Sequence, residues 1–502
     1  MADVLMVYPK TGFDVEGAIA PPFALLTVAA PLVNGGYSVK IIDQRVDASW
    51  KLNLINELKK NPLYVAITSM SGSQIGFALQ ISKIIRENTK EIPIVWGGAH
   101  PTILPEQTLE NPNIDIVVEG EGELTALELT EALKEKKGLE NVKGIRFKRK
   151  DGSQMITGAR PLINIEDMLP TPWALVNPED YIYKDFYMRG VKRTMDIGQT
   201  SRGCPYKCGY CCSSYIRKYW RPISAQKSIE RIVNDVRRFN LDSIWIRDDN
   251  FFADIERARE ICQGIIDEGL NIKWYTSGTR ADAINRMTHE QITTFKKSGG
   301  EVFKIGAESG SDRILKFIDK GCTVKELHLA NLKSKQYDII PAMSFIGGFP
   351  TETYEELMQT INCMIKVKKD NPAAIVESMC IYTPYPKTNL WPLAIEHGLQ
   401  PPQTLEEWEN WGLHDFNDKR NPSLKPADRR RLGNICYISM LASVVGDLTE
   451  SIKNPLKRVL IKALVKPASL YYEWRFKHKL FSWLPELTFI RWVRFKMLDE
   501  AK

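Results

Sequence analysis

Three cysteines in one short segment are the residues best suited to do chemistry. Cys204, Cys208 and Cys211 lie in the run SRGCPYKCGYC, so one loop carries three thiolates. Thiolates bind iron–sulfur clusters and zinc alike, but a structural zinc site takes four ligands, usually as two pairs far apart in the sequence. No second pair exists here, and Cys212 would be strained as a fourth ligand because it is adjacent to Cys211. We therefore expect a 4Fe–4S cluster with one iron open to a chelating substrate; zinc or a plain structural role is the alternative.

The elements that must position this loop alternate between strand and helix. About six such units run from Thr194 to residue 400, and the cysteines follow the first strand. The strands that we expect end near Ser201, Arg247, Gly278, Gly306, Gly347 and Tyr382. Polar residues at the carboxyl ends of successive parallel strands are how α/β barrels build their sites. Cys380 and Tyr382 share one face of the last strand, where either could donate hydrogen or gate a substrate, unless both belong to the core.

The first 140 residues carry a second strand–helix alternation, which predicts a doubly wound parallel sheet. The strands that we expect are Val4–Tyr8, Ser38–Asp43, Tyr64–Ser69, Ile92–Trp96 and Ile114–Val118, with helices over Phe23–Val33 and Gln74–Glu87. Ligands of such sheets bind outside the carboxyl ends of the strands, and three of these ends are small and polar, at residues 69–74, 97–100 and 119–123. No GxGxxG follows the first strand, so a dinucleotide site is unsupported. Ordinary tight turns are the alternative.

Composition limits the class of protein. The chain has 502 residues, which suggests about three domains, and its 43% hydrophobic and 26% charged residues exclude disordered, collagen-like and coiled-coil classes. Nine cysteines, an odd number, disfavour a disulfide scaffold. Asp3 argues against a signal peptide, and the apolar span 435–446 is shorter than the ~20 residues of a membrane crossing. We therefore expect a cytoplasmic protein.

The net charge of +7 is concentrated at the end of the chain. From Ser451 onward, 12 Lys or Arg stand against four Asp or Glu. Residues 471–496 interleave aromatic and basic side chains, which suits either a helix at the inner face of an anionic membrane or a helix packed on the protein. Nucleic acid is a further partner that a basic tail favours.

At the cysteine loop the sequence resembles the radical S-adenosylmethionine (SAM) superfamily, by its CxxxCxxC spacing and by Tyr210 before the last cysteine. The resemblance implies a partial (β/α)6 barrel in which SAM chelates the open iron. A reducing electron donor then drives its cleavage to a 5′-deoxyadenosyl radical, which abstracts hydrogen from an unactivated carbon. The implied SAM residues are Asp248 and Asp249 for the methionine amine, Arg280 for the carboxylate, Glu308 and Ser309 for ribose or amine, and Gly347, Gly348 and Pro350 beside the adenine. Caps, turns or ion pairs are the alternative roles.

The N-terminal half resembles the cobalamin-binding domain that precedes many radical SAM cores. The resemblance is carried by PPFALL, GGAHPT and VEGEGE, which begin at Pro21, Gly97 and Val118. It implies a Rossmann-like domain that binds cobalamin through Ser69, Ser71, Gln74, Gly97, Gly98, His100, Glu119, Gly120, Glu121 and Gly122. The Asp-x-His-x-x-Gly motif is missing, which implies a cobalamin without histidine on cobalt. A degenerate fold kept only for structure is the alternative.

Together the resemblances imply a cobalamin-binding domain over 1–140, a connector over 141–193, the barrel over 194–400 and a helical, basic region over 401–502. They imply methylation of an unactivated sp3 carbon, in which the substrate radical takes the methyl group of methylcobalamin. The segments 382–388 and 404–408 also resemble the anaerobic porphyrin-ester cyclase branch and hopanoid-modifying enzymes, so radical cyclisation stays open. So does the substrate: lipid, pigment, small molecule or peptide. An RNA-modifying, methylthiotransferase-like enzyme, and with it nucleic acid as partner, is disfavoured because no cysteine precedes Cys204.

Overall fold

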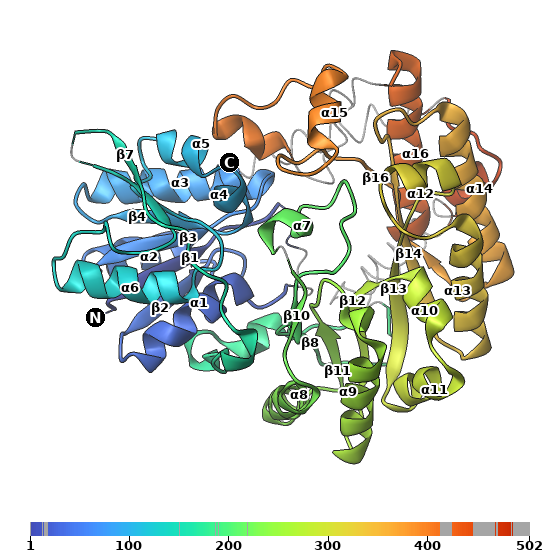
Figure 1. Cartoon of the computed structure of the whole chain (residues 1–502), viewed down its shortest axis with the longest axis horizontal. Helices are drawn as coiled ribbons and strands as arrows, with labels where there is room; N and C mark the ends of the chain where they lie inside the picture. Colours follow the sequence, from blue (N-terminus) through green and yellow to red (C-terminus); the bar gives the residue numbers. More distant parts are fainter. Residues whose placement is uncertain are drawn as a thin grey trace.

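The computed structural model describes residues 2–411, apart from gaps at 13, 15–18, 150, 186, 189 and 218, and then residues 424–444, 467, 470–482 and 484. These residues form two large sheets and one two-stranded sheet, with helices packed around them; the N-terminal sheet is at the left of Figure 1 and the second large sheet at the right. Much of the stretch 471–496, where we considered an interfacial helix, lies outside the described residues.

The N-terminal sheet has seven strands in the order β2-β1-β3-β4-β5-β6-β7. They are β1 (Val4–Tyr8), β2 (Val39–Asp43), β3 (Tyr64–Thr68), β4 (Ile94–Gly97), β5 (Ile116–Val118), β6 (Ile145–Lys148) and β7 (Gln154–Ile156). The first five are parallel, as predicted, whereas β6 and β7 extend the sheet antiparallel from the segment that we expected to be connector. The strand order reverses between β1 and β3, and doubly wound sheets bind ligands at such a reversal.

Helices cover both faces of this sheet, because its strands are apolar on both sides. The helices are α1 (Phe23–Asn34), α2 (Trp50–Leu58), α3 (Ser73–Asn88), α4 (Ala99–Ile103), α5 (Pro105–Glu110) and α6 (Glu123–Lys134). Met6 and Tyr64 share a core with α1 and α6, whereas Leu5 and Val65 share a core with α3 on the other face. This two-sided burial fixes the strand register, because a slip by one residue would exchange the two faces.

The second sheet is an open barrel wall of parallel strands in the order β15-β14-β13-β12-β11-β8, with β16 paired to β14. Its strands are β8 (Thr194–Ile197), β11 (Ser243–Ile246), β12 (Lys273–Thr279), β13 (Gly300–Glu308), β14 (Ile340–Gly347), β15 (Ile375–Val376) and β16 (Cys380–Ile381). The connecting helices are α8 (Ala225–Phe239), η4 (Phe251–Ala253), α9 (Ile255–Asp267), α10 (Ala281–Arg286), α11 (His289–Lys297), α12 (Asp312–Phe317), α13 (Val324–Gln336) and α14 (Tyr354–Asp370). Neighbouring strands in space follow chain order, which is the expected partial (β/α)6 barrel.

The first barrel strand is shorter than the sequence suggests, ending at Ile197 rather than near Ser201. The backbone N–H and the hydroxyl of Thr200 donate to Asp248 at 2.6 and 2.7 Å, and the Ser201 hydroxyl donates to the same carboxylate at 2.7 Å. These bonds lead the chain out of the sheet. Instead, β9 (Ser201–Arg202) pairs antiparallel with β10 (Arg221–Pro222), so the cysteine loop starts from a small ladder of its own.

The segments outside the two sheets join them. Three 3-10 helices lie between the sheets in sequence: η1 (Ile165–Asp167), η2 (Trp173–Leu175) and η3 (Pro178–Tyr181). After the barrel come α15 (Trp391–Glu396), η5 (Glu406–Asn410) and α16 (Pro426–Val444). The chain returns through η5 to the N-terminal domain, where Trp408 and Trp411 pack in the same apolar core as α3. Within the described ranges, no helix combines the length and the apolar character that a membrane span requires.

Candidate functional site

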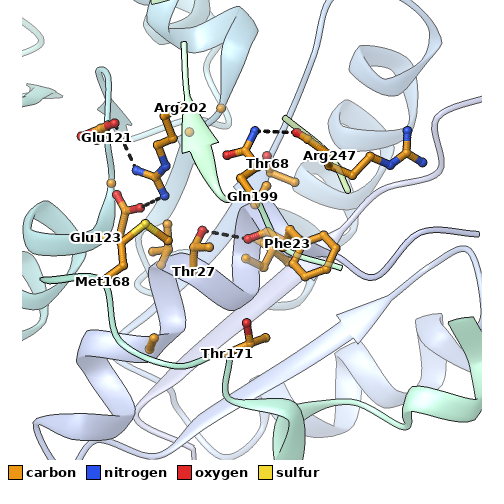
Figure 2. A pocket seen from close by; sticks show the side chains of 18 of the residues that line it. Phe23, Thr27, Thr68, Glu121, Glu123, Met168, Thr171, Gln199, Arg202 and Arg247 are labelled. Atoms are coloured by element: carbon orange, nitrogen blue, oxygen red, sulfur yellow. Dashed lines mark hydrogen bonds and ion pairs between the residues drawn. The ribbon is translucent and has the colours of Figure 1, made fainter. Parts of the chain in front are cut away.

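A cavity of about 1130 Å³ lies between the N-terminal sheet and the barrel, and Figure 2 shows part of its lining. One wall comes from strands β1, β3, β4 and β5 with helices α1 and α6, and the other from the end of β8, from Cys212 and from α7 (Ser213–Ile216) and α8. Apolar side chains such as Met6, Tyr64 and Val95 line part of it. Pockets for drug-sized ligands measure about 300–1,000 Å³, so this space suits a larger ligand with apolar surface.

Six of the ten residues predicted to bind cobalamin line this cavity: Gln74, Gly97, Gly98, Gly120, Glu121 and Gly122. Ser69, Ser71, His100 and Glu119 are not part of the lining. Gly98 has φ +104°, and a Cβ there would lie 2.7 Å from the Ser69 carbonyl oxygen. Only glycine therefore lets the end of β4 approach β3 this closely at the cavity wall.

His100 is a core residue in this structure. It is fully buried, its Nδ1 lies 2.8 Å from the Ser71 hydroxyl, and its ring centroid lies 5.3 Å from that of Trp408. Burial lowers the pKa of His100 to about 3, so the imidazole is neutral. Among the described residues that line the cavity there is no histidine, in keeping with the missing histidine motif.

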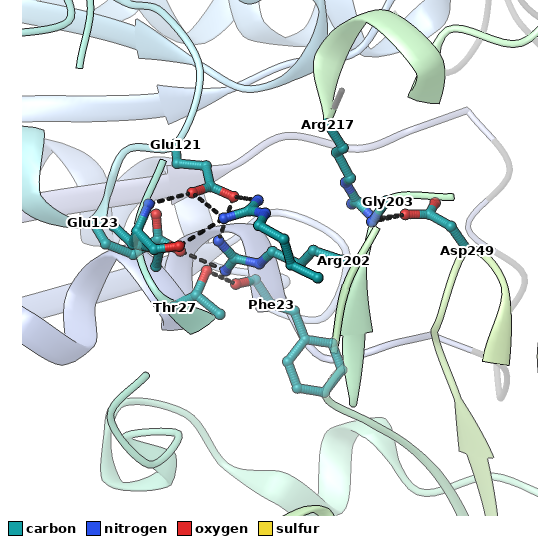
Figure 3. A network of polar contacts seen from close by, with 10 residues as sticks. Phe23, Thr27, Glu121, Glu123, Arg202, Gly203, Arg217 and Asp249 are labelled. Atoms are coloured by element: carbon teal, nitrogen blue, oxygen red, sulfur yellow. Dashed lines mark hydrogen bonds and ion pairs between the residues drawn. The ribbon is translucent and has the colours of Figure 1, made fainter. Parts of the chain in front are cut away.

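Ion pairs join the glycine-rich loop after β5 to the ladder that precedes the cysteines. Glu121 Oε1 accepts from Arg202 at 3.1 Å and also pairs with Arg221, and Glu123 pairs with the same Arg202 (Figure 3). The side chains of Arg202, Glu121 and Glu123 are 9%, 13% and 8% exposed. Burial would raise the pKa of Glu121, but Arg221 and Arg202 hold it below its usual range. We call these four residues the interdomain clamp.

The cysteine loop lies between β9 and α7. Cys204, Cys208 and Cys211 are free thiols, and the Cys211 amide donates to the Cys208 carbonyl at 3.0 Å, which closes a tight turn. Donors lie beside two of the sulfur atoms, with Asn250 Nδ2 3.7 Å from Cys204 Sγ and Arg280 Nη1 3.8 Å from Cys208 Sγ. Donors and cations stabilise thiolates, so the surroundings of the loop fit an anionic cluster.

Burial acts on these thiols in the opposite sense. It raises the pKa of Cys208 and raises that of Cys211 to about 12, so these two thiols stay protonated until metal binding releases the proton. In the described part of the chain, no three His, Cys, Asp or Glu side chains surround a point that one metal ion could occupy. Three separate thiolates fit a cluster, in which each binds its own iron.

Glu308 is the centre of a buried polar group at the end of β13. Its φ of +63° is a left-handed conformation that is costly for a residue other than glycine and is often found at functional sites. Its Oε1 accepts from Lys320 Nζ at 2.8 Å and from the Tyr210 hydroxyl at 2.7 Å. Burial would lower the pKa of Lys320, but the Glu308 carboxylate raises it above its usual value, so the Lys320 ammonium group stays charged. Two predicted SAM residues, Tyr210 and Glu308, therefore meet.

Arg280 lies beside the same group, at the end of β12. Its Nε donates to Asp282 at 2.8 Å, its Nη2 donates to the Lys320 carbonyl, and its guanidinium carbon lies 3.6 Å from the ring centroid of Tyr206. Nη1 is the nitrogen that approaches Cys208 Sγ. The guanidinium is thus held rigidly next to the cysteine loop, where a carboxylate on an open iron would be in reach of a cation.

Asp248 and Asp249, predicted to hold the methionine amine, make other contacts in this structure. Asp248 is 1% exposed and is bonded by Thr200 and Ser201, as described above, and burial raises its pKa. Asp249 Oδ2 accepts the amide of Gly203 at 2.9 Å and pairs with Arg217 (Figure 3). In these contacts both carboxylates shape the start of the cysteine loop.

The glycine–proline loop after β14 is folded around a buried acid. The amides of Gly348 and Phe349 donate to Glu352 Oε2, the second at 3.3 Å, so Gly348 and Pro350 lie in a tight turn directly after Gly347, the last residue of β14. Burial raises the pKa of Glu352 to about 8. Ser309, from the end of β13, lies 3.1 Å from the Thr360 hydroxyl of α14 and holds that helix against the strand.

Tyr382 and Cys380 lie at the last strand, as predicted. Tyr382 is 2% exposed, and its ring centroid lies 5.1 Å from that of Phe349, which in turn lies 5.8 Å from that of Tyr210. Tyr382 therefore belongs to an aromatic row that leads to Glu308. Cys380 is paired with Ile346 of β14, and burial raises its pKa to about 11. The half-buried, protonated thiol and the packed ring fit the core alternative at least as well as a catalytic role.

The inner face of the barrel wall is polar. The Arg247 guanidinium carbon lies 3.3 Å from the ring centroid of Trp245 and pairs with Asp196, while Lys304 Nζ lies 4.8 Å from the same ring and 3.3 Å from Glu377 Oε1. The carbonyl of Arg247 accepts from Gln199 at 3.1 Å at the cavity, and its guanidinium extends away from that bond (Figure 2). Charged residues within short strands, such as Asp196 in β8 and Lys304 in β13, are the sequence pattern that indicates this polar face.

Lys320, Arg202 and Arg221 are further residues of the site that the sequence analysis missed. Arg202 lies two residues before Cys204, so its place beside the motif was a usable signal. Lys320 pairs with a residue 12 positions away, across α12, and Arg221 pairs with one 100 positions away. No local pattern marks pairs at such separations.

The two halves match two known families. Residues 10–130 match the B12 binding domain, and residues 199–364 match the radical SAM superfamily. An uncharacterized methyltransferase of Pyrococcus horikoshii is 34% identical over 402 residues, which cover 79% of this chain and 84% of that protein. The anaerobic magnesium-protoporphyrin IX monomethyl ester cyclase of Synechocystis is 27% identical over 393 residues, covering 78% and 76%.

Solved structures share the fold. The cobalamin-dependent SAM radical enzyme OxsB has a TM-score of 0.71 with 18% identity, covering 98% of this chain and 75% of that one. The radical SAM methyltransferase TsrM of Kitasatospora setae has a TM-score of 0.64 with 18% identity, covering 82% of each chain. Both resemblances drawn from the cysteine loop and the glycine-rich strand ends are confirmed. The chain belongs to the radical SAM enzymes that carry a B12-binding domain.

Proposed function

We propose that this chain methylates an unactivated carbon of its substrate and that a 4Fe–4S cluster, SAM and cobalamin bind at the junction of its two domains. One observation carries the proposal: a single cavity is lined both by strand ends of the B12-binding domain and by Arg202 and Cys212, which flank the three cysteines. Bound there, the cluster would supply the electron that cleaves one SAM, and cobalamin would carry to the substrate a methyl group taken from a second SAM. Two cofactors that act on one carbon must be held in one enclosed space, and this cavity offers it.

The residues of the chain have separate tasks in this proposal. The three cysteines hold the cluster, with Asn250 and Arg280 beside their sulfur atoms. Lys320 and Tyr210 hold the Glu308 carboxylate in place. It therefore accepts hydrogen bonds from the amine or ribose of SAM without a change in its own position. The planar cation of Arg280 faces the carboxylate of SAM.

Cobalamin lies against the glycine-rich strand ends. At Gly97 the space above the backbone is bounded by Val118, and at Gly120 it is open, so a flat ring system can approach the main chain. The apolar side chains of β1, β3 and β4 that line the cavity suit the less polar parts of the cofactor. No histidine is among the described lining residues, so these residues would hold cobalamin without supplying an imidazole.

The test is the fate of the SAM methyl group. The protein is reconstituted anaerobically with iron, sulfide and cobalamin, and is incubated with methyl-deuterated SAM, a reductant and a metabolite extract of its source organism. Methylation predicts a product that carries the deuterated methyl group, together with 5′-deoxyadenosine. The similarity to the porphyrin-ester cyclases keeps radical ring closure as the second candidate. A product that lacks the label and has lost hydrogen establishes ring closure instead.

The polar inner face of the barrel bears on the substrate class. Arg247 and Lys304 lie over the same Trp245 ring, and their side chains are 35% and 19% exposed, so two cations remain accessible from inside the barrel. A hydrocarbon placed there would desolvate both ion pairs without replacing their hydration. We therefore expect a substrate with polar or anionic groups, whose labelled product partitions into the water-soluble fraction of the extract. A labelled product in the lipid fraction contradicts this expectation and leaves methylation standing.

Contact with a membrane surface is a separate proposal for the end of the chain. Leu470, Tyr471 and Trp474 are exposed by 57%, 48% and 51%, next to Lys477 and Lys479. Exposed aromatic side chains beside cations suit the interface of an anionic bilayer. We expect co-sedimentation with vesicles of anionic lipid, reduced by replacing Tyr471 and Trp474 with serine. Equal sedimentation of the two proteins rejects the membrane contact.

A further inference from the structure

The interdomain clamp joins the glycine-rich loop at the cavity to the residues that directly precede the cysteine loop. Glu121 lies between Gly120 and Gly122, all three of which line the cavity. Its partner Arg202 lies two residues before Cys204. Figure 3 shows the carboxylates of Glu121 and Glu123 against Arg202, with Gly203 next along the chain and bonded to Asp249.

The clamp also places carboxylates beside two like charges of the β9–β10 ladder. Arg202 and Arg221 are directly opposite each other in this two-residue ladder. Like charges directly opposite destabilise an antiparallel pair. Glu121, from the other domain, pairs with both arginines, and Arg221 also donates to the Ile163 carbonyl at 2.7 Å. The positive charges of the ladder from which the cysteine loop starts are therefore neutralised by a carboxylate of the cobalamin-binding domain, not by one of the barrel domain.

We propose that Glu121, Arg202 and Arg221 are positioning residues, which set where the cysteine loop lies relative to the cobalamin wall of the cavity. The inference rests on the proposed function, because it concerns the relative placement of two cofactors. The guanidinium groups of Arg202 and Arg221 donate several hydrogen bonds to the Glu121 carboxylate. These bonds fix both the distance between the groups and their relative orientation. Misplacement of reacting groups by about 1 Å can cost 10²-fold in rate, so such a device matters for transfer between the sites.

A second contact keeps the domains together when the clamp is broken. Trp408 and Trp411 of the returning chain pack in the core of the N-terminal domain, and Trp408 Nε1 donates to Gln107 at 2.6 Å. This contact contains no member of the clamp. Loss of the clamp therefore changes the alignment of the sites and leaves both domains folded and joined.

The experiment compares Glu121→Gln and Arg221→Gln with Glu128→Gln in the anaerobically reconstituted full chain. Glu128 is a matched control. It lies on α6, pairs bidentately with Arg160 and is not among the residues that line the cavity. We expect unchanged iron content in all three. We expect the dissociation constant for cobalamin to rise by about tenfold in the two clamp variants, the scale of one lost charge-assisted hydrogen bond. The dipolar effect of the reduced cluster on the cob(II)alamin EPR signal should change in the same two variants and not in the control.

The Arg221→Gln variant distinguishes a positioning role of the clamp from direct contact with cobalamin. Glu121 lines the cavity and could touch cobalamin itself, whereas Arg221 is not among the lining residues. If only Glu121→Gln alters binding and the EPR coupling, Glu121 is a direct ligand and the positioning role is rejected. The positioning role is also rejected if the clamp variants have the same cobalamin dissociation constant and the same EPR coupling as Glu128→Gln. Should Glu121→Gln fail to fold, Arg202→Lys keeps the charge but loses the fork, and is expected to shift the EPR coupling alone.

Failure of the proposed function is recognised separately. If the unaltered protein binds no cobalamin, the proposed function is wrong, and the clamp inference is rejected with it. If the unaltered protein binds cobalamin and the clamp variants behave like Glu128→Gln, the function stands and only the clamp inference is rejected.

Discussion

Lys320→Met should destabilise the barrel, because it removes the cation that pairs with Glu308. The two charges are 2.8 Å apart and their side chains are only 7% and 8% exposed. Removing one partner of a buried ion pair costs about 3–5 kcal/mol, mostly because the other charge stays buried without compensation. The Tyr210 hydroxyl still donates to Glu308 at 2.7 Å, so we expect a loss near the lower end, about 3 kcal/mol.

The assay is urea unfolding of the metal-free chain, followed by tryptophan fluorescence, with each transition fitted separately because the two domains need not unfold together. Lys316→Met is the control, since Lys316 is exposed on the preceding helix and its loss should stay within about 0.5 kcal/mol. The double variant Lys320→Met/Glu308→Gln should recover most of the loss, because a neutral amide needs no cation. The reasoning is refuted if Lys320→Met is as stable as the control, or if the double variant loses the sum of the two single changes.

Two further predictions concern Glu352 and the glycines of the cavity wall. Burial raises the pKa of Glu352 from 4.5 to about 8, so the folded state holds the proton more tightly and stability falls as pH rises through that window. Glu352→Gln should therefore gain roughly 2–4 kcal/mol over the unaltered protein near pH 9 and nothing near pH 4, measured by urea unfolding at both values. Gly98→Ala should abolish cobalamin binding in a visible-spectrum titration, because its Cβ would clash with the Ser69 carbonyl. Gly120→Ala, where φ is +79° and the space is open, should cost only about 1 kcal/mol and keep binding.

The five parallel strands of the N-terminal sheet could be predicted within about two residues, because buried parallel strands are short apolar runs bounded by glycine and polar residues. β1 has the predicted bounds, and β3 differs by one residue. The end of β8 could not be predicted in this way. It depends on the carboxylate of Asp248, nearly 50 residues later, which takes the hydrogen bonds of Thr200 and Ser201.

In the candidate site, too, local sequence predicts some features, and others depend on residues far away in the chain. Residues within the motifs could be predicted as a group, since the motifs place them at strand ends that share one edge. What each side chain contacts depends on partners far away in the chain, such as Lys320 for Glu308 and Arg202 for Glu121. His100 illustrates the limit: its position in a glycine-rich loop favoured a ligand, but packing against Trp408 of the returning chain buries it.

The most direct test of the account is a comparison of two cysteine variants after anaerobic reconstitution with iron and sulfide. We predict that replacing Cys204, Cys208 and Cys211 together with alanine removes bound iron and ends the release of 5′-deoxyadenosine from SAM. Cys212→Ala should keep about four irons per chain, because it leaves all three cysteines of the CxxxCxxC motif in place. Iron and deoxyadenosine release that persist in the triple variant contradict the account at its centre.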